Sequence, residues 1–145
     1  IFDMDELPGA DDYVDEELDL PALAETFRQS QWANRQPYAI ELPVETPVGS
    51  VTVRGRIDAV FRTDSGGWDL IDWKTGRVPH GKDLRRKSGQ LALYRLAFAR
   101  LHGLDLTDVS AAFYYVTEDR EVRPHDLATE KELEAIVESM YQVRG

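Results

Sequence analysis

The alternation of apolar and polar residues between residues 39 and 74 predicts three consecutive strands. A turn at residues 46–50 (TPVGS) separates the first two strands, and residues 64–67 (DSGG) separate the second from the third. The third strand runs from Trp68 to about Lys74. The first strand alternates through Ile40, Leu42 and Val44, and the apolar residues expected to share one face of the second are Val51, Val53, Ile57, Ala59 and Phe61.

Three other segments have the apolar periodicity of helices. The first begins near Pro21, a residue suited to a first helical turn, and is expected to end near Asn34. The second covers residues 83–102 and stops at Gly103, because glycine readily takes the left-handed conformation that closes a helix. The third covers about residues 129–142.

The segment between the last two helices completes the predicted fold. Residues 109–127 predict two strands around a turn at Glu118-Asp119. The order α-β-β-β-α-β-β-α predicts an α/β (α+β) domain with a mixed central sheet flanked by helices. No apolar run approaches the roughly 20 residues needed to cross a membrane. The chain has no cysteine, which excludes disulfides and cysteine-ligated metals and favours a cytoplasmic protein.

The distribution of charge changes the meaning of its total. A net charge of −10 argues against a nucleic-acid partner, but residues 1–20 hold nine acids and no Lys or Arg. We expect residues 1–19 to be an acidic linker or arm and residues 20–145 to be the domain. The rest of the chain is nearly neutral, and residues 74–87 carry six basic residues against one acid. Because the chain begins at Ile1, we expect it to be part of a longer protein.

Alternation also predicts which polar side chains meet. In the third strand, Leu70, Asp72 and Lys74 share one face, and Ile71 and Trp73 share the other. In the second strand, Arg54, Arg56 and Asp58 are expected on the face opposite the apolar residues. A hairpin centred near Ser65 places Asp58 opposite Asp72, with their Cβ atoms about 5 Å apart.

Two carboxylates at that separation repel each other, and three arrangements relieve the repulsion. One acid can be protonated. Arg56 or Lys74 can pair with both acids. A divalent cation can lie between them, since carboxylate oxygens are hard ligands of the kind that Mg²⁺ takes.

The second helix supplies further polar residues. Gln90 and Tyr94 lie on one helical face because they are four residues apart, and Lys87 is one turn before Gln90. The pair either points at the end of the third strand or forms a polar flank on the domain surface.

Three short motifs together resemble the PD-(D/E)XK nuclease superfamily. They are GRID at residues 55–58, LIDWKTG at residues 70–76 and QLALY at residues 90–94. The likeness is greatest to the RecB-like C-terminal nuclease domain of UvrD/RecB-type ATP-dependent helicase–nucleases, over roughly residues 38–117. The resemblance implies a restriction-endonuclease-like fold and metal-dependent hydrolysis of DNA in repair or recombination.

The resemblance assigns a role to each motif residue. Asp58, Asp72 and the backbone carbonyl of Trp73 would bind Mg²⁺ or Mn²⁺, and Lys74 would orient the attacking water and stabilise charge on the phosphate. Gln90 and Tyr94 would position the lysine, the water or the DNA. The residues expected to hold DNA phosphates are Arg56, Arg77, Lys82, Arg85, Arg86 and Lys87.

One feature departs from the family pattern. The family has a metal-binding histidine upstream of the GRID strand, whereas the histidines here are His80, His102 and His125. We therefore keep two alternatives, a catalytically silent module that guides DNA and a subunit-interaction domain. The partners that the resemblance implies are single-stranded DNA, a helicase motor in the same parent chain and a second helicase–nuclease subunit.

Overall fold

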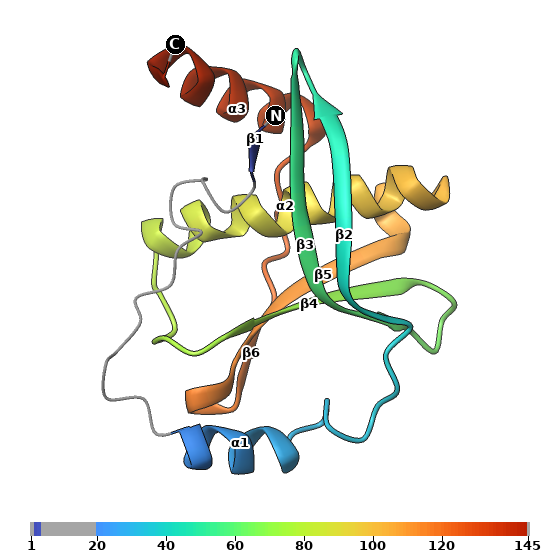
Figure 1. Ribbon diagram of the computed structural model, residues 1–145, viewed down its shortest axis with the longest axis vertical. Helices are drawn as coiled ribbons and strands as arrows, with labels where there is room; N and C mark the ends of the chain where they lie inside the picture. The colour runs from blue at the N-terminus through green and yellow to red at the C-terminus, as the bar shows by residue number, and fades with distance from the viewer. Residues whose placement is uncertain (1, 4–19, 145) are drawn as a thin grey trace.

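The computed structural model describes residues 2–3 and 20–144 (Figure 1). In these residues one mixed sheet has the strand order β1-β3-β4-β5-β6, and β2 pairs along β3. The strands are β1 (Phe2–Asp3), β2 (Ala39–Val48), β3 (Val51–Arg62), β4 (Trp68–Lys74), β5 (Val109–Tyr115) and β6 (Arg120–Val122). The helices are α1 (Leu20–Arg28), α2 (Lys82–His102) and α3 (Glu130–Arg144), with short 3₁₀ turns η2 (Leu106–Asp108) and η3 (Val116–Glu118).

This order confirms the α+β architecture predicted from the sequence. Figure 1 shows α2 beside the sheet, with α1 and α3 at opposite ends of the molecule. Of the expected arm, residues 2 and 3 pair in parallel with β3 at Val53 and Arg54, and residues 4–19 lie outside the described part. None of the described helices is both long and apolar enough to span a membrane.

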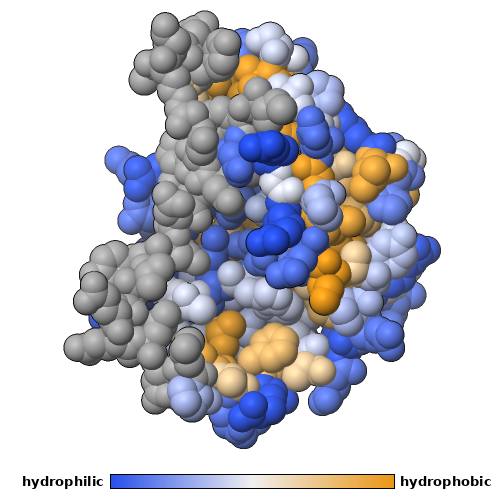
Figure 2. All heavy atoms as spheres, in the orientation of Figure 1, coloured by the Kyte–Doolittle hydropathy of each residue, from blue (hydrophilic) through white to orange (hydrophobic). Residues whose placement is uncertain are grey.

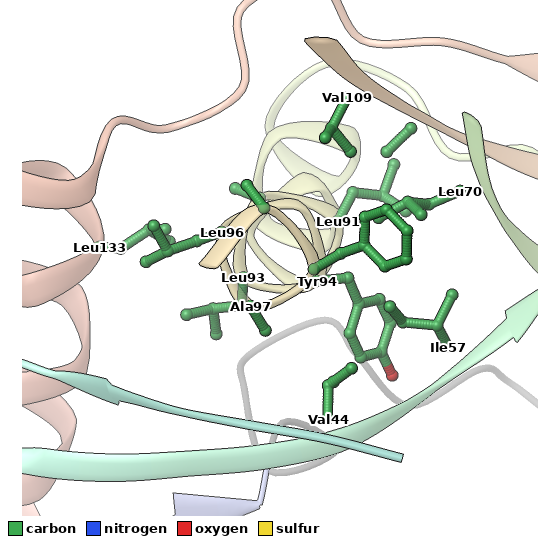
Figure 3. Close-up of a cluster of buried hydrophobic side chains, with 14 of the residues drawn as sticks. Val44, Ile57, Leu70, Leu91, Leu93, Tyr94, Leu96, Ala97, Val109 and Leu133 are labelled. Atoms are coloured by element: carbon green, nitrogen blue, oxygen red, sulfur yellow. The ribbon is translucent and has the colours of Figure 1, made fainter. Parts of the chain in front are cut away.

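The central strand β4 is covered on both faces. On one face Leu70 belongs to a buried cluster with Leu91, Leu93 and further apolar residues of α2, and Leu133 of α3 lies beyond them (Figure 3). On the other face Ile71 packs with residues that follow α1. Because both faces are covered, every side chain of β4 except that of Trp73 is buried.

An aromatic cluster attaches α1 to the second face. The Trp32 ring lies 5.1 Å from that of Phe61 and 6.1 Å from that of Trp73, centroid to centroid. Phe27 of α1 meets the edge of Trp73 at 5.4 Å. Such pairs add a modest attraction to the apolar area that they bury. The cluster therefore supports β4 from behind, next to Asp72 and Lys74.

Two local predictions about the first helix and the β2–β3 hairpin are wrong. The helix ends at Arg28 instead of near Asn34 because the Ser30 hydroxyl donates to the Phe27 carbonyl and accepts from the Trp32 N–H, which favours a turn. In the hairpin, alternation predicts that Ile40 lies on one apolar face with Leu42 and Val44, but Ile40 is 66% exposed.

The apolar residues of β3 also divide between the two faces. Val53 and Ile57 belong to the core beneath α2, whereas Ala59 and Phe61 belong to the core beneath α1. The hairpin ladder is interrupted at Glu41, which has a φ of 47°, and the position opposite it is Asp58. The face to which alternate residues of β3 point changes here, although the register is the same on both sides of this position. Simple alternation therefore fails across residue 58.

The end of α2 follows its prediction. Gly103 takes the left-handed conformation (φ 63°, ψ 40°), and the Leu104 N–H returns to the Ala99 carbonyl. At the surface, Ile40 and Leu101 are exposed apolar residues, and on the face in Figure 2 apolar groups are interrupted by hydrophilic ones.

We expect Trp32→Ala to lower the free energy of unfolding by about 3 kcal/mol, because it leaves a cavity in the cluster behind β4. Urea unfolding measures this change. Leu101→Ala is the control, since Leu101 is 60% exposed and its truncation is expected to change stability by less than about 0.5 kcal/mol. Equal effects of the two substitutions would show that the aromatic cluster contributes little.

Candidate active site

The pairing of β3 with β4 places Asp58 beside Asp72. The ladder runs from Arg62 opposite Trp68 to Ala59 opposite Ile71, and the same register puts Asp58 opposite Asp72, as predicted. Asp58 Oδ2 accepts a hydrogen bond of 2.9 Å from the Trp73 N–H. The Asp58 side chain thus satisfies the backbone N–H of Trp73, which lies just beyond Ala59–Ile71, the last backbone pair of the ladder.

Asp72 and Lys74 form a buried ion pair. Lys74 Nζ lies 3.0 Å from Asp72 Oδ2, and the two residues are 6% and 5% exposed. Taking both charges out of water carries a large desolvation penalty, which mutual attraction offsets only in part. The pair is therefore weak evidence for stability and stronger evidence for a chemical role.

The polar residues of α2 meet the same lysine. Gln90 Oε1 accepts a hydrogen bond of 3.4 Å from Lys74 Nζ, and Gln90 Nε2 donates to the Tyr94 hydroxyl at 3.3 Å. Gln90 and Tyr94 are 4% and 3% exposed. Of the two arrangements considered from the sequence, the surface flank is excluded and the pair points at the end of β4.

Burial strongly affects the acid of this pair. Removal from water raises the pKa of Asp72 from 3.8 to about 7, Lys74 opposes the rise, and Asp58 adds to it by like-charge repulsion. Asp72 Oδ2 is buried without a hydrogen bond, although Lys74 lies at ion-pair distance from it. Lys74 is therefore the close cationic neighbour of this oxygen among the described residues.

The donor set fits a divalent metal with few protein ligands. Asp58 and Asp72 present carboxylates from adjacent strands, and Mg²⁺ commonly binds one or two carboxylates while keeping several waters. Among residues 2–3 and 20–144, no group of three or more His, Cys, Asp or Glu is placed to hold a metal. His80, His102 and His125 are all exposed. Binding by the Trp73 carbonyl stays a prediction.

The expected phosphate-binding residues lie mostly at the surface. Arg77, Lys82, Arg85 and Arg86 are exposed, and Lys87 is half-buried. Arg86 pairs with Asp83 at 2.8 Å. Arg77 precedes α2, and the other four residues lie about one to two turns before Gln90 within the helix. The basic stretch therefore leads along the helix toward the buried lysine.

Arg56 does not take the expected place beside Asp58. It is exposed and lines a surface hollow of about 490 Å³ with Arg54, Glu45 and Asp3. Asp58 instead bonds to Trp73 and faces Asp72. The prediction that Arg54, Arg56 and Asp58 share a face is therefore wrong, because the alternation of faces along β3 fails at residue 58.

Two arrangements near the site have no signal in the sequence. The Thr117 hydroxyl donates to the Thr75 carbonyl, and the Val78 N–H donates to Glu118, so the turn after β5 holds the loop that follows Lys74. Asp69 is a second buried carboxylate on β4, with Arg123 as its partner at 2.8 Å. Separations of about 40 residues or more hide both arrangements from local patterns.

We expect Asp72→Asn to change the pH dependence of stability. Because the folded state raises the pKa of Asp72, its favourable contribution is fully present at acid pH and is lost as the pH rises from about 4 to about 7. Between pH 4 and pH 8 the variant should therefore gain up to about 4 kcal/mol relative to wild type. Urea unfolding without divalent metal measures the difference.

The control for this prediction is Asp83→Asn, which removes a carboxylate whose side chain is 64% exposed. Its difference from wild type should stay nearly constant over the same pH range. A constant difference for Asp72→Asn as well would contradict the raised pKa.

Comparisons with known proteins extend the motif evidence to nearly the whole chain. Residues 3–144 match the model of the PD-(D/E)XK nuclease superfamily, whose restriction-endonuclease-like fold agrees with the mixed sheet and flanking helices. Gene 69 protein of Mycobacterium phage D29 is 35% identical over 108 residues, which are 72% of this chain and 37% of the relative. The crystal structure of SSO0001 is similar over 73% of this chain and 50% of that one, with a TM-score of 0.49 at 20% identity. On the family match, the chain belongs to the PD-(D/E)XK nuclease superfamily.

Proposed function

We propose that this chain is a Mg²⁺- or Mn²⁺-dependent deoxyribonuclease that hydrolyses phosphodiester bonds. Membership of the superfamily implies a nuclease in general terms. The observation that supports activity in this chain is the position of Lys74, which is buried and held between Asp72 Oδ2 at 3.0 Å and Gln90 Oε1 at 3.4 Å. Its partner Asp72 has a pKa raised by burial, and groups perturbed in this way are concentrated at functional sites.

In this proposal the two carboxylates form the metal-binding side of the site. Asp58 and Asp72 would hold the ion, which when bound lowers the pKa of a coordinated water and polarises a phosphoryl oxygen. Asp58 is already fixed by the Trp73 N–H through Oδ2. This bond orients its carboxylate without using a charged partner.

Lys74 would act on the substrate directly. Its ammonium group donates toward the attacking water and toward the phosphate oxygens on which charge develops. Gln90 accepts from Lys74 and is itself held by Tyr94, so both α2 residues act as positioning residues for the amine. Burial of the three side chains keeps the amine in one orientation before substrate binds.

We further propose that the substrate is single-stranded DNA. Arg56, Arg77 and the basic residues at the start of α2 would hold backbone phosphates, which gives affinity with little sequence preference and a strong dependence on salt. The order and spacing of the three motifs support a RecB-like helicase–nuclease as the parent, acting in the cytoplasm in repair or recombination. This chain spans 37% of the length of the phage relative.

Lys74→Ala and Asp72→Ala should each lower cleavage of single-stranded DNA in Mn²⁺ by about a hundredfold or more, because the first removes charge stabilisation from the reacting phosphate and the second removes a ligand of the metal ion. The measurement is the initial rate on a fluorescently labelled oligonucleotide. Lys131→Ala is the matched control, since it removes an exposed lysine of α3 and should cut at the wild-type rate.

Two other outcomes have clear meanings. If Asp72→Ala cuts as well as wild type, the site assignment is wrong. If no protein cuts but all bind DNA with a steep salt dependence, the silent DNA-guiding module is correct; it is favoured by the lack of a third metal-ligand side chain among the described residues.

Mn²⁺ should raise the thermal unfolding midpoint of wild type by several degrees, since a ligand that binds only the folded state stabilises it. The rise should be larger at pH 8 than at pH 6, because Asp72 must lose its proton to bind the ion. Asp58→Asn should abolish the rise, whereas Asp83→Asn should retain it. A full rise in Asp58→Asn would place the metal elsewhere.

A further inference from the structure

A second polar pocket lies away from the Asp58–Asp72–Lys74 site. It has a volume of about 220 Å³, and the residues that matter to its chemistry are Arg95, Thr107, Ser110, Arg123 and His125. In the β4–β5 register Ser110 pairs with Asp69, whereas Lys74 pairs with Tyr115, five residues further along β5. At about 3.3 Å per residue, the two sites are roughly 16 Å apart along the strand.

Arg95 enters this pocket from α2. It directly follows Tyr94, and since successive side chains point about 100° apart around a helix, the two residues serve different sites. Arg95 Nε is buried and has no hydrogen-bond partner in the described part of the chain. Burial lowers the pKa of the guanidinium, and no described acid counteracts that effect. A buried donor without an acceptor is destabilising unless a ligand supplies one.

Arg123, on the other side of the pocket, is already neutralised. It donates to both carboxylate oxygens of Asp69, at 2.8 and 2.9 Å, and to Glu121 at 3.1 Å. These bonds use three of the five N–H donors of a guanidinium. Arg123 is therefore committed to Asp69 and Glu121, and Arg95 forms no ion pair with a described residue. The described residues that line the pocket include no Asp or Glu.

We propose that this pocket binds a phosphate group, with Arg95 as its principal cationic ligand. The Ser110 hydroxyl already bonds to Trp68 and Asp69, and the other polar donors come from three segments, namely α2, η2 and the segment after β6, so they approach from different directions. A tetrahedral oxyanion with several acceptor oxygens suits such donors better than a planar carboxylate. The volume is below the range of sites for drug-sized ligands, which indicates a small anion or one terminal phosphate. The proposal does not depend on nuclease activity.

The direct test follows the arginine Nε–Hε signals of the whole chain by ¹⁵N NMR during titration with sodium phosphate. The Arg95 signal, identified by its loss in Arg95→Gln, should shift saturably, and sodium chloride at equal ionic strength should not reproduce the shift. An Arg28 signal serves as the internal control, because Arg28 is exposed and paired with Glu25. An equal response in chloride, or no response at Arg95, would overturn the proposal.

Thermal unfolding gives a second readout. Phosphate should raise the midpoint of wild type and of Arg28→Gln above its value in chloride, and Arg95→Gln should lose that rise. An equal rise in Arg95→Gln would count against the site. If Arg95→Gln does not fold, the wild-type spectrum is the test. An arginine signal that shifts saturably in phosphate but not in chloride, while the Arg28 signal does not move, supports the proposal. The absence of such a signal overturns it.

A short oligonucleotide with a 5′-phosphate and one with a 5′-hydroxyl distinguish the two sources of the phosphate. If the 5′-phosphorylated oligonucleotide shifts the Arg95 signal at a tenfold lower concentration than inorganic phosphate does, the ligand is a strand end. If the 5′-phosphorylated oligonucleotide and inorganic phosphate act at equal concentrations, the ligand is the free ion. Both results support a phosphate site. Equal shifts with the 5′-hydroxyl oligonucleotide would contradict recognition of a terminal phosphate.

Discussion

The hydrogen bond between the Trp73 N–H and Asp58 Oδ2 is the contact on which the geometry of the site depends. It lies where the β3–β4 backbone ladder ends, and a side chain there takes over from the backbone. Without this bond a donor of β4 would lack its partner and the Asp58 carboxylate would be free to turn away from Asp72. One interaction thus satisfies the strand and brings the second acid to the buried ion pair.

The Asp72–Lys74 pair shows how such a site opposes stability. Burial raises the pKa of Asp72 to about 7, so ionising it near neutral pH works against folding. The apolar residues of α2 and the aromatic cluster behind Trp73 supply the compensating stabilisation. An active site that is costly to fold is common in enzymes, because the groups needed for chemistry are seldom those that pack best.

Much of this arrangement could be predicted from local patterns. The bounds of β4, its register with β3 and the shared face of Asp72 and Lys74 follow from a period of two and a short turn. The meeting of Gln90 with Lys74 follows from helical spacing and chain order. The division of β3 between two cores does not, because the alternation of its faces fails at residue 58 and no apolar pattern announces that change. The Asp69–Arg123 pair joins residues 54 positions apart, beyond the range of any local pattern.

The burial of β4 on both faces has a consequence for how this sequence can change. The Trp73 ring packs against the aromatic cluster, while its neighbours Asp72 and Lys74 face α2. Inserting or deleting one residue within the strand would exchange these faces, pushing charge into the aromatic cluster and an indole into the site. Variation in length is therefore confined to the turn at residues 63–67 and the loop at residues 75–81, and β4 can evolve only by substitution.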